Sequence, residues 1–162
     1  MPSILIVCTG NICRSPMGMA LLRSKFAERD ETRDWVVESA GTWAPDGSHA
    51  SEHGITAMRE RGLEAHVLPH RARSVTAAML QRFDLVLTMT QSHKEALGVE
   101  FPEAREKIYL LSEMVDEHWD VDDPIGGPLE AYRKTAALLD DVLDRGLERI
   151  IALAKANASR PS

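Results

Sequence analysis

Two residues near the start of the chain have the types and spacing for covalent phosphate chemistry. Cys8 ends a short apolar run, five residues follow it, and Arg14 stands just before a Ser-Pro pair. A cysteine thiolate is a strong nucleophile, and a planar guanidinium holds two phosphoryl oxygens at once. Backbone N–H groups in a loop that leads into a helix can form an anion-binding nest. The spacing therefore predicts that Cys8 attacks a phosphate held by Arg14 and the loop amides.

The residues around this pair suit such a loop. Gly10 and Asn11 tolerate the positive φ angles that a tight anion-binding turn can require. A hydroxyl at Ser15 can donate a hydrogen bond to the Cys8 thiolate, which the positive surroundings also stabilise. We therefore expect the substrate to contact the loop residues Thr9, Gly10, Asn11, Ile12, Cys13 and Ser15. A buried cysteine with an unrelated surface arginine is the alternative, and the strand–loop–helix context favours the chemistry.

The reaction also needs a proton donor, because phosphate departs poorly from an alkoxide or phenoxide. The segment 120–124, Asp-Val-Asp-Asp-Pro, lies just before the last helical pattern and holds the candidates. A proline biases the preceding residue toward extended backbone, which can aim a carboxylate out of a loop. These residues alone do not choose between Asp122 and Asp123, and a solvated acidic loop is the other interpretation.

The elements that position these groups follow from hydrophobic patterning. Short apolar runs predict four strands, at 4–7, 35–39, 84–89 and 107–111. Helical spacing and start signals predict four helices, one beginning with Ser15 near its cap and Pro16 in its first turn, and three over 50–61, 91–97 and 129–154.

The alternation of strands and helices predicts the fold class. It is α/β, a single three-layer domain with a four-stranded parallel sheet and helices on both faces. We expect this domain to cover residues 1–157 and to be followed by a tail over 158–162. In such sheets ligands bind beyond the carboxyl ends of the strands, where Cys8 lies.

Composition narrows the class of function. The 162 residues are 44% hydrophobic and 27% charged, with a net charge of −6, as in a globular protein. There is no Lys/Arg block, so neither nucleic acid nor a membrane is an expected partner. Two cysteines and six scattered histidines lack metal-ligand spacing, so we expect no metal or other cofactor and surface or structural histidines. The N-terminus lacks signal-peptide features, and we expect a cytoplasmic monomer that acts on a phosphorylated protein or peptide.

The run Cys-Thr-Gly-Asn-Ile-Cys-Arg-Ser-Pro at 8–16 resembles the signature loop of the low-molecular-weight protein tyrosine phosphatases. Further segments are similar to that family in the expected order, at 38–42, 70–73, 84–89 and 123–124. The resemblance implies hydrolysis through a phosphocysteine. In that family the acid directly precedes the proline, which selects Asp123. It also implies that Ser39 partners Asn11, and a strand-end hydroxyl that bonds to backbone is the other interpretation of Ser39. It implies further that Trp43 forms a groove wall, and a partly buried Trp43 is the alternative.

Departures from the family pattern bear on the substrate. Ile125-Gly126-Gly127 follows Asp-Pro where many tyrosine-directed members have aromatic residues, and this pattern resembles the bacterial protein arginine phosphatases. Those enzymes favour threonine where this chain has Ile12, an apolar residue that suits an aryl phosphate. We therefore expect a phosphotyrosine phosphatase, with a protein arginine phosphatase as the alternative.

Two other possibilities remain open. Cys13 either packs in the interior or forms a reversible disulfide with Cys8 that protects the nucleophile, as in some relatives. A non-catalytic phosphopeptide-binding module is the remote alternative. Such a module would need neither Cys8 nor Asp123, and this chain has both.

Overall fold

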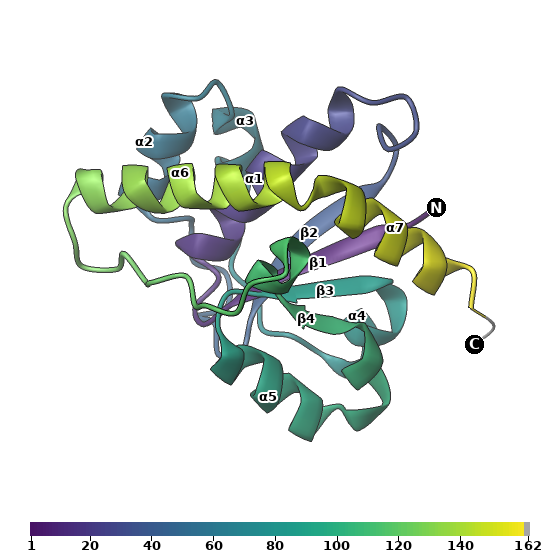
Figure 1. The fold of residues 1–162 in the computed structure, drawn as a ribbon. Helices are drawn as coiled ribbons and strands as arrows, with labels where there is room; N and C mark the ends of the chain where they lie inside the picture. The colour runs from purple at the N-terminus through teal and green to yellow at the C-terminus, as the bar shows by residue number, and fades with distance from the viewer. Residues whose placement is uncertain (161–162) are drawn as a thin grey trace.

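The computed structural model describes residues 1–160 and has a parallel sheet at its centre (Figure 1). The strands are β1 (Ser3–Cys8), β2 (Val36–Gly41), β3 (Leu85–Thr88) and β4 (Ile108–Leu110). They pair in the order β2-β1-β3-β4, and every pairing is parallel. The predicted four-stranded parallel sheet is confirmed, with strand bounds one or two residues from those expected.

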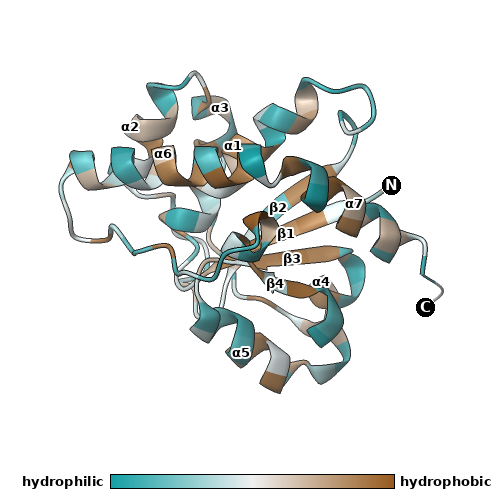
Figure 2. Ribbon diagram, in the orientation of Figure 1, coloured by the Kyte–Doolittle hydropathy of each residue, from teal (hydrophilic) through white to brown (hydrophobic). Residues whose placement is uncertain are grey.

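Helices cover both faces of the sheet, as the fold class requires. One face packs on α1 (Arg14–Ala27), α6 (Leu129–Arg145) and α7 (Leu147–Ala158). The opposite face packs on α4 (Ala77–Arg82), α5 (Gln91–Glu100) and the 3₁₀ helix η1 (Pro102–Lys107). Figure 2 accordingly shows apolar strands between helices whose outer surfaces are polar.

The central strand shows why this packing is stable. Every residue of β1 is buried, with Ile4 and Ile6 on the face toward α1 and Leu5 and Val7 on the face toward α5. Strand side chains alternate between faces, so a strand covered on both sides reads as a continuous apolar run. The run ends at Cys8, which places the thiol at the carboxyl edge of the sheet.

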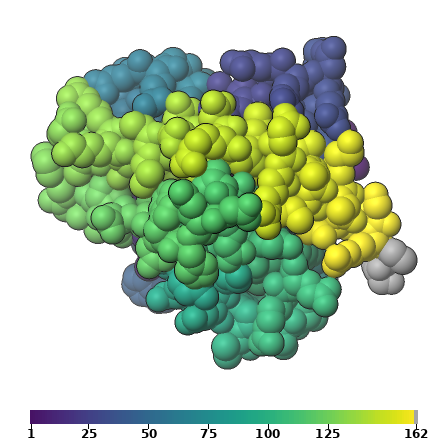
Figure 3. Space-filling model, viewed as in Figure 1, coloured from purple at the N-terminus to yellow at the C-terminus, as the bar shows by residue number. Residues whose placement is uncertain are grey.

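The remaining elements lie around this core. Helix α2 (Glu52–Arg59) contacts α1 and α6, and the short α3 (Glu64–Val67) contacts α1 and α2. The 3₁₀ helix η2 (Leu111–Val115) follows β4 and leads to the acidic segment. The C-terminal helices extend across the front of the molecule (Figure 3).

The single long helix predicted over 129–154 is wrong, because two helices meet at Gly146. A Cβ at this position would lie 2.7 Å from the Cβ of Met114 in η2 and 3.0 Å from the Val142 carbonyl oxygen. Only glycine permits this close approach, which the helical periodicity does not report. The short elements α3, α4, η1 and η2 also have too few residues to show a periodic pattern.

The first helix begins at Arg14, with Cys13 in the cap position. Ser15 therefore lies near the cap, as predicted, but the helix has no side-chain cap. The Ser15 hydroxyl bonds to Cys8 and Asn11 instead. Pro16 does lie in the first turn, where its missing N–H costs no helical hydrogen bond.

Two findings concern membrane-spanning helices and the C-terminal end of the chain. Within residues 1–160, no helix has both the length and the apolar character needed to cross a bilayer. Helix α7 continues to Ala158, one residue into the expected tail at 158–162, of which residues 161–162 lie outside the described part.

Candidate active site

The loop between β1 and α1 brings the predicted nucleophile and anion-binding arginine to one edge of the sheet. Cys8 is the last residue of β1 and is 2% exposed, and Arg14 is the first residue of α1 and is 4% exposed. The Cys8 Sγ lies 2.9 Å from Ser15 Oγ. Because Ser15 Oγ accepts a hydrogen bond from Asn11 Nδ2, its own hydrogen is available to the sulfur.

The same loop leaves hydrogen-bond donors without protein acceptors. Within residues 1–160, no backbone N–H of residues 9–14 donates to a protein acceptor. The Arg14 Nε is buried and also lacks a partner among these residues. Buried donors are normally satisfied, so consecutive free donors beside a thiol indicate a site for an anion. The residues present therefore fit a phosphoryl group.

The rest of the Arg14 guanidinium is fixed from two directions. Its Nη1 donates to the Val121 carbonyl oxygen at 2.7 Å, and its Nη2 lies 3.3 Å from Thr9 Oγ1. The same Nη2 is 3.5 Å from Asp123 Oδ2. A guanidinium held in one plane can present a fixed fork to an oxyanion.

Asn11 holds the shape of the loop. Its φ angle is 57°, in the left-handed region that Asn tolerates better than most residues, whereas Gly10 has no positive φ. The side-chain Nδ2 donates to Ser15 Oγ and Ser39 Oγ, both at 2.9 Å, and Oδ1 accepts from the Arg73 backbone N–H at 3.0 Å. The Ser39 contact implied by the family resemblance is therefore confirmed. Asn11 joins the loop to β2 and to the segment after α3.

The end of β2 presses directly on the loop. A Cβ at Gly41 would lie 2.3 Å from the Thr9 carbonyl oxygen, a distance that no side chain permits. Gly41 also accepts from the Val75 N–H through its carbonyl and donates to the Arg73 carbonyl. The neighbouring strand thus sets the position of the loop backbone.

A buried histidine that the sequence analysis did not assign to the site contacts Thr9. His93 Nδ1 accepts from the Thr90 N–H at 3.2 Å, so the ring hydrogen resides on Nε2, which donates to Thr9 Oγ1 at 2.8 Å. Burial, with Arg14 adding to it, lowers the pKa of His93 to about 4. Thr9 Oγ1 accepts from His93 and Arg14, which leaves its own hydrogen for a bound anion.

A second histidine supports the loop from behind. His70 Nε2 lies 2.7 Å from the Asn11 carbonyl oxygen, so Nε2 carries the hydrogen that it donates. Both histidines are structural, as expected, yet neither was linked to the site. For His93 a usable signal was its place three residues after Thr90, just beyond the carboxyl end of β3.

The acidic segment reaches the loop at one carboxylate. Asp123 Oδ2 faces Arg14, while its Oδ1 accepts from the Ile125 N–H at 3.1 Å, and its side chain is 37% exposed. Asp122 is exposed and has no hydrogen bond within residues 1–160. The backbone of Val121 anchors the segment, because its N–H donates to the Met89 carbonyl at 2.8 Å.

The remaining predicted contact residues differ in exposure. Ile12 is half-buried against the core, and Trp43 is 76% exposed beside the loop, where its N–H donates to the Thr9 carbonyl. The partly buried interpretation of Trp43 is therefore wrong.

Cys13 is a buried free thiol 3.4 Å from the Tyr132 hydroxyl, and Cys8 is also free. Burial raises the pKa of Cys13, and burial together with Cys13 raises the pKa of Tyr132 to about 12. Cys13 is thus a neutral thiol at neutral pH. Across residues 1–160, no three His, Cys, Asp or Glu side chains are grouped to hold a metal ion.

Comparison with known proteins identifies the class that this fold and site define. The family model described as low molecular weight phosphotyrosine protein phosphatase matches residues 3–156. The chain therefore belongs to this family of protein phosphatases.

Relatives of two substrate types are similar to the chain. It is 40% identical over 148 residues to a protein-arginine-phosphatase of Geobacillus stearothermophilus, covering 91% of this chain and 95% of the relative. It is 36% identical over 143 residues to the low molecular weight protein-tyrosine-phosphatase Wzb of Escherichia coli K12, covering 88% of each. The crystal structure of a low molecular weight protein tyrosine phosphatase from T. tengcongensis superposes with a TM-score of 0.85 at 39% identity, covering 92% of this chain and 99% of that one.

Proposed function

We propose that this phosphatase hydrolyses phosphotyrosine-type phosphomonoesters in proteins or peptides through a phosphocysteine formed on Cys8. The observation that carries the proposal is the group of free donors around the thiol. Among residues 1–160, the amides of residues 9–14 and the Arg14 Nε have no protein acceptor and lie beside a buried Sγ. A passive binding loop would need the donors but not the thiol.

In the first step the Cys8 thiolate attacks phosphorus, forming the S–P bond as the P–O bond to the leaving group breaks. Asp123 gives its proton to the departing oxygen. Arg14 and the loop amides hold the three equatorial oxygens, over which charge is spread in the transition state. The contact of Asp123 with Arg14 at 3.5 Å supports Asp123 over Asp122 for this role.

In the second step water attacks the phosphocysteine. Asp123, now a carboxylate, takes a proton from the water while the new O–P bond forms and the S–P bond breaks. The sulfur leaves as a thiolate and receives the hydrogen bond of Ser15, which lies 2.9 Å away. Inorganic phosphate is the product.

Phosphoarginine in proteins is the second candidate substrate. The 40% identity to a protein-arginine-phosphatase and the Gly126-Gly127 pair favour it. The half-buried apolar Ile12 and the exposed ring of Trp43 favour a flat aryl phosphate, because both offer apolar contact and Ile12 has no hydroxyl for a guanidinium. The same two steps would then break a P–N bond.

The expected setting is also part of the proposal. We infer a cytoplasmic monomer, with residues 1–157 as the phosphatase domain and no nucleic-acid or membrane partner. The net charge of −6 without a basic block and the two free thiols support this view. Fractionation of the source cells and sedimentation of the purified chain test it.

Hydrolysis of p-nitrophenyl phosphate by wild type and Cys8→Ser tests the nucleophile. The wild type should turn over the ester, and Cys8→Ser should have no measurable activity because the hydroxyl is not ionised at neutral pH. Full activity in Cys8→Ser would show that the nucleophile is wrong, and an inactive wild type would favour the binding module.

Turnover of matched phosphotyrosine and phosphoarginine peptides tests the substrate. The wild type should have the higher kcat/KM on the phosphotyrosine peptide. Ile12→Thr should raise the phosphoarginine-to-phosphotyrosine ratio, and Ile12→Val is the control of similar shape without a hydroxyl. An unchanged ratio in Ile12→Thr would remove Ile12 from the argument.

A further inference from the structure

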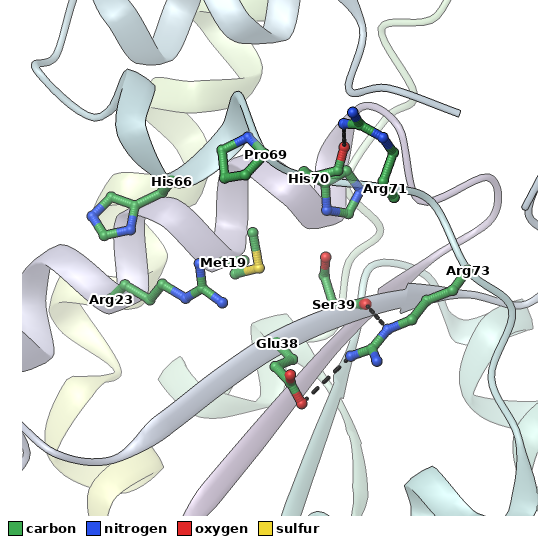
Figure 4. Close-up of a pocket in the computed structure, with 9 residues that line it drawn as sticks. All are labelled: Met19, Arg23, Glu38, Ser39, His66, Pro69, His70, Arg71 and Arg73. Atoms are coloured by element: carbon green, nitrogen blue, oxygen red, sulfur yellow. Dashed lines mark hydrogen bonds and ion pairs between the residues drawn. The ribbon is translucent and has the colours of Figure 1, made fainter. Parts of the chain in front are cut away.

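A basic cavity lies beside the catalytic loop, where lining residues bond to Asn11. Its volume is about 250 Å³, and its walls come from α1, β2, α3 and the segment that follows α3 (Figure 4). The charged and titratable side chains that face it are Arg23, Arg71, Arg73, Glu38, His66 and His70. Three arginines against one glutamate give a formal charge of +2 with neutral histidines, in a chain whose net charge is −6.

Glu38 neutralises only part of this positive charge. Glu38 lies 3.4 Å from Arg73 and 3.1 Å from Arg82, so it is already shared. Across residues 1–160, neither Arg23 nor Arg71 has a carboxylate partner. Their hydrogen bonds go to the carbonyl oxygens of Val37 and His70. Three guanidinium groups that line one cavity with a single, already shared carboxylate favour an oxyanion there.

The pKa values of the titratable groups around the cavity reflect burial and the nearby charges. Burial lowers the pKa of His66 and of His70, and neighbouring arginines lower both further. Burial also lowers the pKa of Arg23, while the Glu38 carboxylate opposes this shift and Arg73 adds to it. The positive charges thus disfavour one another, and an anion among them would relieve that repulsion.

The cavity also contacts the framework of the catalytic loop. The ring of His70 donates to the Asn11 carbonyl, and the Arg73 N–H donates to the Asn11 side chain. Ser39, another lining residue, accepts from Asn11. Because His70 Nε2 carries the donated hydrogen, Nδ1 of the neutral ring carries none, and it has no hydrogen-bond partner among residues 1–160. Protonation at Nδ1 would create a second donor without breaking the contact with Asn11.

We propose that this cavity is a second oxyanion site, distinct from the Cys8 loop, that takes a phosphate-class anion between Arg23, Arg71 and His70. The cavity is smaller than the pockets of about 300–1,000 Å³ that hold drug-sized ligands, which suits a single oxyanion. Occupancy favours protonated His70, whose contact with Asn11 links the site to the catalytic loop. Inorganic phosphate is also the product under the proposed function, so the link would let product act from beside the loop.

The test measures histidine titration by NMR with inorganic phosphate as the probe and sodium chloride at equal ionic strength as the reference. In the wild type, phosphate should raise the pKa of His66 and His70 by about one unit, since a nearby opposite charge favours the protonated ring. The exposed His118 should not respond. No turnover is needed, so an inactive enzyme would still give a clear answer.

Matched variants separate the cavity from the catalytic loop, where phosphate also binds. Arg23→Gln with Arg71→Gln should remove most of the phosphate-dependent shift, while Arg149→Gln with Arg160→Gln, an equal charge change at exposed positions, should retain it. The variant Arg23→Lys with Arg71→Lys keeps the positive charge and should keep part of the phosphate-dependent pKa shift. This variant controls for misfolding. An equal shift in the Gln cavity variant, or no shift in the wild type, would overturn the proposal.

Discussion

The catalytic loop and the acidic loop meet at Arg14, yet they are built in opposite ways. The loop from Cys8 to Ser15 is buried at its key positions, and its side chains bond to β2, α5 and the segment after α3. The acidic loop is exposed at Asp122, Asp123 and Ile125 and is anchored mainly through Val121.

The difference follows from what each loop must do. Charge stabilisation requires donors fixed before the substrate arrives, because reorganising them during the reaction costs free energy. A general acid must instead meet leaving groups of various shapes, which an exposed carboxylate allows. Mutations in the first loop should therefore damage both stability and turnover, and mutations in the second should damage turnover alone.

Arg14→Lys should give the largest effect. The lysine side chain has one charged centre and cannot contact Val121, Thr9 and a phosphate together as the guanidinium does. We expect kcat/KM on p-nitrophenyl phosphate to fall by about 10³-fold. Arg133→Lys, on the exposed face of α6, is the control and should be neutral. A loss below about tenfold would show that charge alone suffices at Arg14.

Asn11→Ala should act mainly on stability. It removes two buried donors and leaves the Arg73 N–H without an acceptor, at an unfavourable φ angle. We expect a loss of about 3 kcal/mol in the free energy of unfolding, measured with urea. Asn11→Gly removes the same bonds but relaxes φ, so it should cost less. Equal losses in both variants would show that φ is unimportant.

Asp123→Asn should reduce turnover while leaving stability intact. The amide cannot protonate the leaving group, so kcat on aryl phosphates should fall by about 10²-fold. Unfolding in urea should change by less than about 0.5 kcal/mol, as for other exposed substitutions. Asp122→Asn is the matched control and should keep wild-type activity. If Asp122→Asn is the slower variant, the acid is Asp122.

His93 should give a smaller effect that depends on pH. Its pKa is about 4 in the folded protein against 6.5 as the ordinary value, with Arg14, Asp120 and Asp123 as its charged neighbours. The contribution of neutral His93 to the free energy of unfolding is complete above pH 6.5 and is lost as the pH falls toward 4. The reason is that His93 takes up its proton at a higher pH in the unfolded chain than in the folded protein. Between pH 7 and pH 5 the loss should be about 2 kcal/mol.

His93→Gln isolates this contribution, since other groups titrate over the same range. The difference in urea stability between wild type and His93→Gln should narrow by that amount at pH 5. A difference that does not change with pH would mean that His93 is not held neutral by its surroundings.

The same contrast explains what could be predicted from the sequence. The cysteine loop could be predicted, because its chemical groups lie within residues 8–16 and the flanking strand and helix have clear local patterns. The supports from His70 and His93 were harder to predict, because they reach Asn11 and Thr9 across 59 and 84 positions of the chain. Only the place of His93 just beyond the carboxyl end of β3 gave a usable signal. The break at Gly146 was missed because only its contact with Met114 reveals it.

The absence of a side chain at Gly41 limits how this catalytic loop could be grafted onto another protein. If residues 8–16 were grafted between a strand and a helix of another protein, the Thr9 carbonyl would lack the neighbouring glycine against which it packs here. A side chain at position 41 would displace the Thr9 carbonyl and with it the amides of the loop. A transplanted loop would therefore need its neighbouring strand as well. The smallest unit that could carry this site is β1, the loop and the start of α1 together with β2.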